Sequence, residues 1–268
     1  MALNGKVALL TGASMGIGEA IATSLAQEGA NLILLARSED KLKDLTKKLS
    51  GSHPGKFIYR AVDISDYNAV ERAVASSADE IGEIDILVNN AGLALGAPSV
   101  FNDLKVQDIL AMNNTNLNGT MFVTYAVLNR SMRPRDSGTI LTVTSTTALE
   151  APPFPGEAVY HTNKAAQEAF TNGLRNELCG TNIRVLALRP GCVATHFHLQ
   201  RVGYDKKQYE EFFDGFDPLI AEDVARSAIF MLSQPLNTSI KALDVVPTAQ
   251  RSLNVFDRKW TERNGKSS

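Results

Sequence analysis

Short apolar runs alternate along the chain with longer segments in which apolar residues recur at helical spacing. The runs with the length and composition of buried strands are residues 7–10, 32–35, 57–59, 86–88, 139–144, 185–188 and 242–246. Between two of them, Leu42, Leu45 and Leu49 have the spacing of one buried helix face. Strands that are apolar throughout are typical of parallel sheets buried on both faces. The pattern therefore predicts an α/β fold in which helices cover a parallel sheet.

A glycine-rich segment follows the first apolar run. Gly12, Gly16 and Gly18 lie between that run and an expected helix. Glycine permits a tight turn and close backbone approach, and the free N–H groups at a helix start attract pyrophosphate. The spacing Gly-x-x-x-Gly-x-Gly differs from the commoner dinucleotide-binding pattern. Taken alone, it is equally compatible with a buried turn that binds no cofactor.

Tyr160 and Lys164 are four residues apart, which places both side chains on one face of a helix. A nearby ammonium favours the phenolate and lowers the pKa of the tyrosine, so that the phenol can exchange protons nearer neutral pH. An amphipathic helix also produces this pair by chance. Whether the pair is catalytic or arises by chance must therefore be judged from the other motifs in the chain.

Several further segments resemble, in order, those of the short-chain dehydrogenase/reductase family. The matching segments are residues 11–18, residues 89–92 (Asn-Asn-Ala-Gly), residues 116–119 (Asn-Leu-Asn-Gly), Ser145, residues 160–164 and residues 190–195 (Pro-Gly-Cys-Val-Ala-Thr). The resemblance extends from Gly12 to Thr195. It implies a single Rossmann-like, doubly wound parallel sheet flanked by helices, with ligands bound beyond the carboxyl ends of the strands.

The resemblance implies a catalytic set of Asn116, Ser145, Tyr160 and Lys164. A ketone oxygen would lie between Ser145, which stabilises its developing charge, and Tyr160, which donates a proton. Lys164 would hold the nicotinamide ribose and lower the pKa of Tyr160, and Asn116 would position a water that connects Lys164 to solvent. By residue type alone, Ser145 could simply end a strand and Asn116 could cap a helix.

The end of the second apolar run indicates which cofactor binds. An NAD enzyme usually carries an acidic residue there for the ribose hydroxyls, whereas this chain has Ala36, Arg37 and Ser38. Arg37 and Ser38 can bind a 2′-phosphate, so NADP(H) is expected, although Arg37 is also compatible with an ordinary surface arginine. The expected cofactor-binding residues, several of them by resemblance, are Gly12, Ser14, Met15, Gly16, Ile17, Gly18, Arg37, Ser38, Asp63, Ile64, Asn90, Ala91, Gly92, Tyr160, Lys164, Pro190, Gly191, Val193 and Thr195.

Segments outside the catalytic set resemble one branch of the family. Residues 84–96, 218–225 and 246–250 are similar to the NADP-dependent 3-hydroxy acid dehydrogenases, which oxidise serine, allo-threonine and related 3-hydroxy acids. The resemblance suggests that Arg201 pairs with a substrate carboxylate. A solvated loop arginine is the equal alternative.

The expected substrate loop departs from that branch. His196 and His198 stand where the branch has a glutamate and a serine, and the loop is unusually aromatic. Phe154 and Phe197, together with residues 212–213, would line a pocket for an apolar or aromatic ketone. The same aromatic residues could instead close a lid or pack beneath it.

The expected function is hydride transfer between NADP(H) and a secondary alcohol or ketone, with a 3-hydroxy acid or related oxo acid as the first substrate class. A ketone reductase for a bulkier hydrophobic metabolite is the alternative within the enzyme class. A non-catalytic NADP-binding module is the alternative from another class. A broken tetrad would favour that module, but all four residues are present.

Bulk properties narrow the possible partners. The chain is 44% hydrophobic and has a net charge of −2 with both signs interspersed, which argues against binding to nucleic acid or anionic membranes. No run reaches membrane-spanning length and no signal peptide precedes the first strand, so we expect a cytoplasmic location and a small-molecule carbonyl or alcohol substrate. Cys179 and Cys192 are interpreted as reduced thiols, and no metal is expected because no cluster has metal-ligand spacing.

No linker or charge block divides the chain, so residues 1–268 are expected to form one dinucleotide-binding and catalytic domain. A substrate loop is expected at about residues 192–220 and a C-terminal tail at about residues 248–268, which could cover a neighbouring subunit or fray. By resemblance to the family, we expect a homodimer or homotetramer that pairs through the helix after Asn116 and the helix carrying Tyr160.

Overall fold

Seven parallel strands form one sheet in the computed structural model, which describes residues 2–152, 155–201 and 204–265. The strand order is β3-β2-β1-β4-β5-β6-β7, so the chain reverses its direction of winding between β1 and β4. The strands are β1 (Val7–Thr11), β2 (Asn31–Ala36), β3 (Phe57–Ala61), β4 (Ile86–Asn89), β5 (Ser137–Val143), β6 (Asn182–Pro190) and β7 (Ala242–Val245). Each apolar run overlaps one of these strands. The predicted parallel α/β fold is confirmed.

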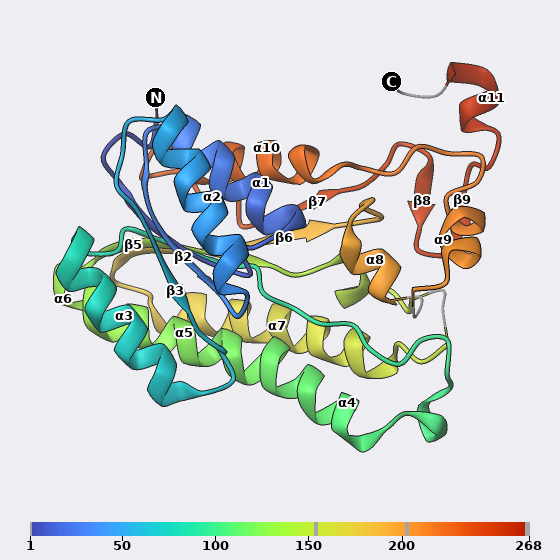
Figure 1. The fold of residues 1–268 in the computed structure, drawn as a ribbon, viewed down its shortest axis with the longest axis horizontal. Helices are drawn as coiled ribbons and strands as arrows, with labels where there is room; N and C mark the ends of the chain where they lie inside the picture. The colour runs from blue at the N-terminus through green and yellow to red at the C-terminus, as the bar shows by residue number, and fades with distance from the viewer. Residues whose placement is uncertain (1, 153–154, 202–203, 266–268) are drawn as a thin grey trace.

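Helices cover both faces of the sheet (Figure 1). The helices on one face are α1 (Gly16–Gln27), α2 (Glu39–Ser52) and α10 (Ala221–Leu232), and those on the other are α3 (Tyr67–Ile81), α5 (Thr120–Val127) and α7 (Ala158–Glu177). Alternate residues of a strand point to opposite faces. Accordingly, Leu10 is buried in the cluster that includes α1, and Leu9 in the cluster that includes α3 and α5. Both faces of the sheet are therefore apolar, so polar functional side chains can lie only at the ends of the strands.

A long helical segment contains two π-helical stretches. It runs from α4 (Val106–Met112) through the π-helical residues Asn113–Gly119 to α5, and then through the π-helical residues Leu128–Met132 to α6 (Arg133–Arg135). π-helical insertions are uncommon and often occur at functional sites. The first of them contains Asn116, whose side chain is fully buried.

The expected substrate loop contains two short helices, α8 (His196–Arg201) and α9 (Lys206–Phe212). They lie at one end of the sheet beside the C-terminal segment (Figure 1). That segment contains β8 (Gln250–Ser252), β9 (Val255–Phe256) and α11 (Trp260–Asn264).

The described part of the expected tail packs against its own chain. Phe256 lies 5.0 Å from Phe216 and 5.6 Å from Phe212 between ring centroids. The Arg258 guanidinium lies 5.2 Å from the centroids of the Phe216 and Phe256 rings. The backbone N–H of Thr261 donates to Gly215 O at 3.2 Å. Residues 256–261 therefore hold the tail against α9 and the turn after it, and we call this set of contacts the C-terminal clamp. The described part of the tail, through residue 265, is not frayed.

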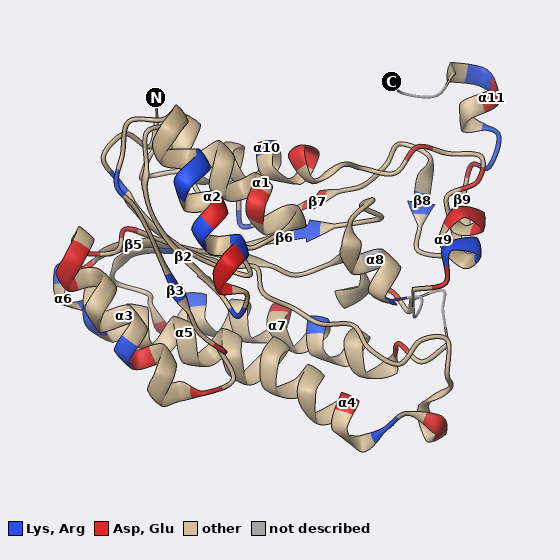
Figure 2. Ribbon diagram, viewed as in Figure 1, with Lys and Arg blue, Asp and Glu red and all other residues tan. Residues whose placement is uncertain are grey.

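Acidic and basic residues are interleaved along the helices of both layers (Figure 2). Among the helices of the described residues, none is long and apolar enough to cross a membrane.

Gly215→Ala should detach this clamp. Gly215 has φ +82°, and a Cβ there would lie 1.9 Å from Arg258 O. We expect a loss of about 2 kcal/mol in the free energy of unfolding, measured by denaturant titration. Gly173→Ala is the matched control because Gly173 lies within α7 with nothing within 4 Å of a built Cβ. It should stabilise the protein by about 0.5–1 kcal/mol, and equal effects of the two changes would contradict the clamp.

Candidate active site

One cavity of ≈ 310 Å³ lies at the carboxyl ends of the strands. Ligands of open α/β sheets bind there, beside the point where the winding reverses. All of the expected cofactor-binding residues line this cavity, as do Ser145, Phe197 and Arg201. The structure therefore brings together residues that the sequence scatters from Gly12 to Arg201.

The glycine turn leaves the backbone open at the cavity. Gly12 has φ +66°, and a Cβ there would lie 2.8 Å from Ala91 Cα. A Cβ on Gly18 would lie 2.1 Å from Gly12 O, so the first turn of α1 packs directly on the glycine segment. The Asn90 amide holds the turn by donating to Thr11 O at 3.1 Å and Gly12 O at 3.2 Å. The glycines thus let the turn pack closely on residues 90–91 and on the start of α1 while the turn itself lines the cavity, an arrangement that fits a dinucleotide pyrophosphate bound at the helix start.

Arg37 and Ser38 lie in the same cavity, just after β2. Arg37 is exposed and makes no ion pair with any described residue. Asp63 also lines the cavity, but its carboxylate accepts bonds from the Ser65 N–H at 2.9 Å and the Ser65 hydroxyl at 2.8 Å. The guanidinium of Arg37 is therefore accessible to an anionic ligand.

Tyr160 is buried near the start of α7, beside Ser145 at the end of β5. Ser145 Oγ accepts from the Thr147 N–H at 3.1 Å and donates to Pro190 O at 3.4 Å. Burial raises the pKa of Tyr160 above its ordinary value, and hydrogen bonds with the Ser145 and Thr147 hydroxyls only partly oppose this rise. The expectation that the pKa of Tyr160 is lowered is wrong, because the loss of hydration on burial outweighs the effect of nearby groups.

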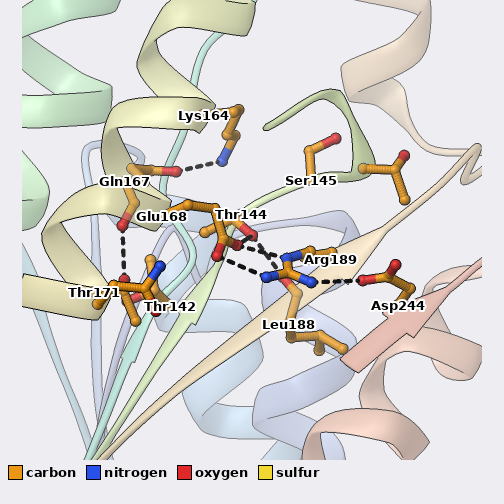
Figure 3. Close-up of polar contacts among 12 residues, drawn as sticks. Thr142, Thr144, Ser145, Lys164, Gln167, Glu168, Thr171, Leu188, Arg189 and Asp244 are labelled. Atoms are coloured by element: carbon orange, nitrogen blue, oxygen red, sulfur yellow. Dashed lines mark hydrogen bonds and ion pairs between the residues drawn. The ribbon is translucent and has the colours of Figure 1, made fainter. Parts of the chain in front are cut away.

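Lys164 lies one helical turn beyond Tyr160, with Nζ 5.8 Å from the centroid of the phenol ring. It is buried, and Nζ donates to Val143 O at 3.0 Å. Nζ also donates to Gln167 Oε1 at 3.0 Å (Figure 3). Burial lowers the pKa of Lys164 to about 8, although the charge of Glu168 acts to raise it. Lys164 is thus poised to change its protonation state near physiological pH.

A buried acid lies next to this lysine. Glu168 Oε1 accepts from Thr144 Oγ1 at 2.6 Å and from Arg189 Nε at 2.9 Å, and its Oε2 accepts from Arg189 Nη2 at 3.0 Å. Arg189 also reaches Asp244 at 3.2 Å (Figure 3). Burial acts to raise the pKa of Glu168, but these hydrogen bonds and charges hold it below its ordinary value. The ionised carboxylate therefore joins α7 to β6 and β7.

Asn116 does not line the cavity, and its amide is engaged within the protein. Asn116 Oδ1 accepts from the Leu93 N–H at 2.7 Å, and Nδ2 donates to Leu93 O at 2.8 Å and to Asn163 Oδ1 at 3.0 Å. Gln167 Nε2 donates to the main-chain O of Asn116 at 2.7 Å. In this structure, the connection between Lys164 and the π-helical turn therefore runs through the Gln167 amide.

Arg201 is buried at the α8 end of the cavity, where it forms an ion pair with the buried carboxylate of Glu157. Burial acts to lower the pKa of Arg201, but the adjacent carboxylate favours the charged guanidinium. Of the two alternatives that the sequence left open for Arg201, the solvated loop arginine is wrong, because the residue is only 8% exposed. A substrate carboxylate would have to compete with the Glu157 carboxylate for the Arg201 guanidinium.

The aromatic residues divide between two places. Phe197 lies against Tyr160 with a centroid distance of 5.7 Å and lines the cavity. Phe212 packs into the C-terminal aromatic cluster, and His196 contacts Tyr204 at 5.7 Å. Phe154 and the side chain of His198 lie outside the described part of the structure. Of the phenylalanines considered from the sequence, Phe197 is therefore the one seen at the reacting groups.

This site geometry agrees with comparisons to known proteins. A protein-family model described as short chain dehydrogenase matches residues 6–202 of the sequence. The chain belongs to the short-chain dehydrogenase family. Within the described residues, no group of three or more His, Cys, Asp or Glu side chains could hold a metal ion.

Two similar proteins and one solved structure cover nearly the whole length of this short-chain dehydrogenase. The NADP-dependent 3-hydroxy acid dehydrogenase of Schizosaccharomyces pombe is 35% identical, over 96% of this chain and 98% of that protein. The serine 3-dehydrogenase of Agrobacterium fabrum is 34% identical, over 90% and 94% respectively. The closed form of serine dehydrogenase complexed with NADP+ has a TM-score of 0.84 at 33% identity, over 94% of this chain and 99% of that chain.

Sequence reasoning missed three residues of this site. Gln167 follows Lys164 at an i+3 spacing, so helical periodicity could have found it. Glu168 follows Lys164 at i+4, but its partner Arg189 comes from a separate strand. Glu157 gave no local signal, because its contact with Arg201 spans 44 residues of sequence.

The affinity for NADPH should depend on whether Lys164 is protonated. Because burial lowers the pKa of Lys164 to about 8, the ammonium is present below that pH and is lost as the pH rises through it. We expect NADPH affinity, measured by cofactor fluorescence, to fall as the pH rises through this range. Lys164→Arg should remove the dependence because its guanidinium stays charged. A flat profile for the unmodified protein would contradict the assignment.

Proposed function

We propose that this short-chain dehydrogenase transfers hydride between NADP(H) and a secondary alcohol or carbonyl compound. The observation that carries the proposal is one cavity with Arg37 among its lining residues and with Ser145, Tyr160 and Lys164 beyond the same strand ends. The similar proteins named for NADP support the choice of cofactor.

The lining residues divide into cofactor-binding groups. The backbone from Gly12 to Gly18 holds the pyrophosphate, and Arg37 and Ser38 bind the 2′-phosphate. Asp63 and Ile64 contact the adenine. Two further groups, residues 90–92 and the residues Pro190, Gly191, Val193 and Thr195, border the nicotinamide end. When bound, NADPH supplies the hydride.

The protein's own side chains handle the charge and the proton. Ser145 donates a hydrogen bond to the carbonyl oxygen as negative charge develops there. Tyr160 donates its phenolic proton to that oxygen, and in the reverse direction its phenolate accepts one. Because burial raises the pKa of Tyr160, the phenol stays protonated, as reduction requires. Lys164, held by Gln167 and through it by Asn116, provides positive charge beside the phenol.

Two substrate classes are consistent with this site. The similar proteins are named for 3-hydroxy acids and for serine, which supports a 3-hydroxy acid or the related oxo acid as the first class. A bulkier hydrophobic ketone is the second, and the position of Phe197 against Tyr160 favours it. Arg201 discriminates between the classes, because it would bind a free carboxylate only if its charge is available.

An enzyme is favoured over a non-catalytic NADP-binding module. Ser145, Tyr160 and Lys164 line one cavity, and Asn116 is joined to Lys164 through Gln167. A module that only senses NADP has no need of this chain of contacts. Turnover of any carbonyl compound would exclude the module.

The proposal also covers domain organisation, location and assembly. Residues 1–268 are proposed to form one domain, because strands from Val7 to Val245 share one sheet. A cytoplasmic location is supported by the two cysteines, both of which are free thiols. A homodimer or homotetramer is supported by exposed apolar side chains on α5, where Met121 is 39% and Tyr125 is 59% exposed.

Tyr160→Phe should lower kcat by about 10³-fold, because the phenylalanine keeps the ring but removes the donated proton. NADPH oxidation followed by absorbance measures turnover, and cofactor fluorescence measures the dissociation constant for NADPH. We expect that constant to change by less than about threefold. Turnover near that of the unmodified protein would rule out Tyr160 as the proton donor.

Arg37→Leu should raise the KM for NADPH by about 10–100-fold and leave the KM for NADH nearly unchanged, because the guanidinium meets only the 2′-phosphate. Steady-state kinetics with the two cofactors in parallel test this. Arg72→Leu, at an exposed arginine of α3 outside the cavity, is the control and should alter neither value. Equal losses for NADPH and NADH would remove Arg37 from the phosphate site.

A further inference from the structure

The ion pair between Glu157 and Arg201 lies at the substrate end of the cavity. Arg201 Nε and Nη2 donate to the two carboxylate oxygens of Glu157, so the contact is bidentate. Glu157 is 2% exposed and Arg201 is 8% exposed. Bidentate contacts of this kind are among the strongest that a guanidinium makes, and burial removes the screening that weakens surface pairs.

The pair lies beside the reacting groups. Arg201 lines the cavity, and its guanidinium carbon lies 6.0 Å from the centroid of the Tyr160 ring. Glu157 is the residue immediately before α7 and comes three residues before Tyr160. A carboxyl group carried by a substrate whose carbonyl oxygen meets Tyr160 would therefore approach Arg201 and find Glu157 already bound.

The local backbone fixes Glu157 in this position. Gly156 has φ +84°, and a Cβ there would lie 2.2 Å from Ser99 O, so the loop before Glu157 packs closely on a neighbouring segment. The Glu157 main-chain O accepts the His161 N–H at 2.8 Å, as the start of a helix requires. Its carboxylate makes no capping bond to α7 and is directed to Arg201 instead.

Displacement of the Glu157 carboxylate from Arg201 by a substrate carboxylate is unfavourable. The displaced glutamate would stay buried beside α7 without its cation, and an unpaired buried charge is strongly destabilising. If Glu157 stays in place, the charge of Arg201 is already neutralised. A free acid therefore gains little from Arg201, whereas a neutral group of the same shape loses nothing.

We propose that Glu157 is a specificity-determining residue that occupies Arg201 and selects carbonyl compounds without a free carboxylate. The substrate is then a neutral derivative of the 3-oxo acid skeleton, such as an ester, or a ketone with an apolar substituent against Phe197. This inference rests on the proposed hydride transfer and specifies its substrate class.

The test compares each acid with its own ester. The probes are acetoacetate with methyl acetoacetate, and benzoylacetate with ethyl benzoylacetate, with NADPH oxidation as the readout. The measured quantity is the ester-to-acid ratio of kcat/KM, in which a general loss of activity cancels. We expect the unmodified protein to prefer the esters by about tenfold or more.

Glu157→Gln should reduce this ratio by about tenfold, chiefly by raising kcat/KM for the acids, because the charge of Arg201 becomes available. The double variant Glu157→Gln with Arg201→Met should restore the preference for esters. Because the double variant leaves no buried unpaired charge, its ratio shows whether the change in the single variant comes from the charge of Arg201 rather than from poor folding. Glu210→Gln, at an exposed glutamate of α9, should leave the ratio unchanged.

Two results would overturn the inference. One is a ratio that Glu157→Gln and the double variant both leave unchanged, which would make the pair purely structural. The other is a preference for the acids in the unmodified protein that Arg201→Met abolishes, because Arg201 would then bind the substrate carboxylate. Absence of NADPH oxidation with every probe, despite normal NADPH binding, would instead count against the proposed reaction itself.

Discussion

The burial of both faces of the central sheet is the constraint on which the rest of the structure depends. Leu9 and Leu10 are adjacent in β1, yet both are fully buried because helices cover each face. With both faces apolar, the sheet can carry polar chemistry only where its strands end. The glycine turn after β1, Ser145 after β5 and the turn after β6 therefore converge on one cavity.

Charged side chains buried at that edge lose the free energy of hydration. Hydrogen bonds and ion pairs with other buried groups offset this loss. Lys164 is held by Val143 and Gln167, and Glu168 by Arg189 and Thr144. The same burial sets the proton affinities. It raises the pKa of Tyr160 and lowers the pKa of Lys164, so both shifts favour the uncharged form of the side chain.

The fold could be predicted because its signals are local, and many of the cavity-lining residues were expected from resemblance to the family. Apolar runs identify strands, and residues at strand ends in parallel sheets meet at one edge. The π-helical turn at Asn116 and the pairing of Glu157 with Arg201 had no such signal. Both depend on which segments the finished fold brings together, as does the rise in the pKa of Tyr160, because burial depth cannot be read from a four-residue spacing.

The Glu157–Arg201 pair shows why similarity to a family of dehydrogenases leaves the substrate open. Hydride transfer needs the groups around Tyr160, whereas substrate choice depends on the charge that remains at the far end of the cavity. An arginine at that end favours an acid only if its charge is uncompensated. The carboxylate of Glu157 supplies that compensation from within the chain, so the same scaffold can direct the same chemistry to a neutral molecule.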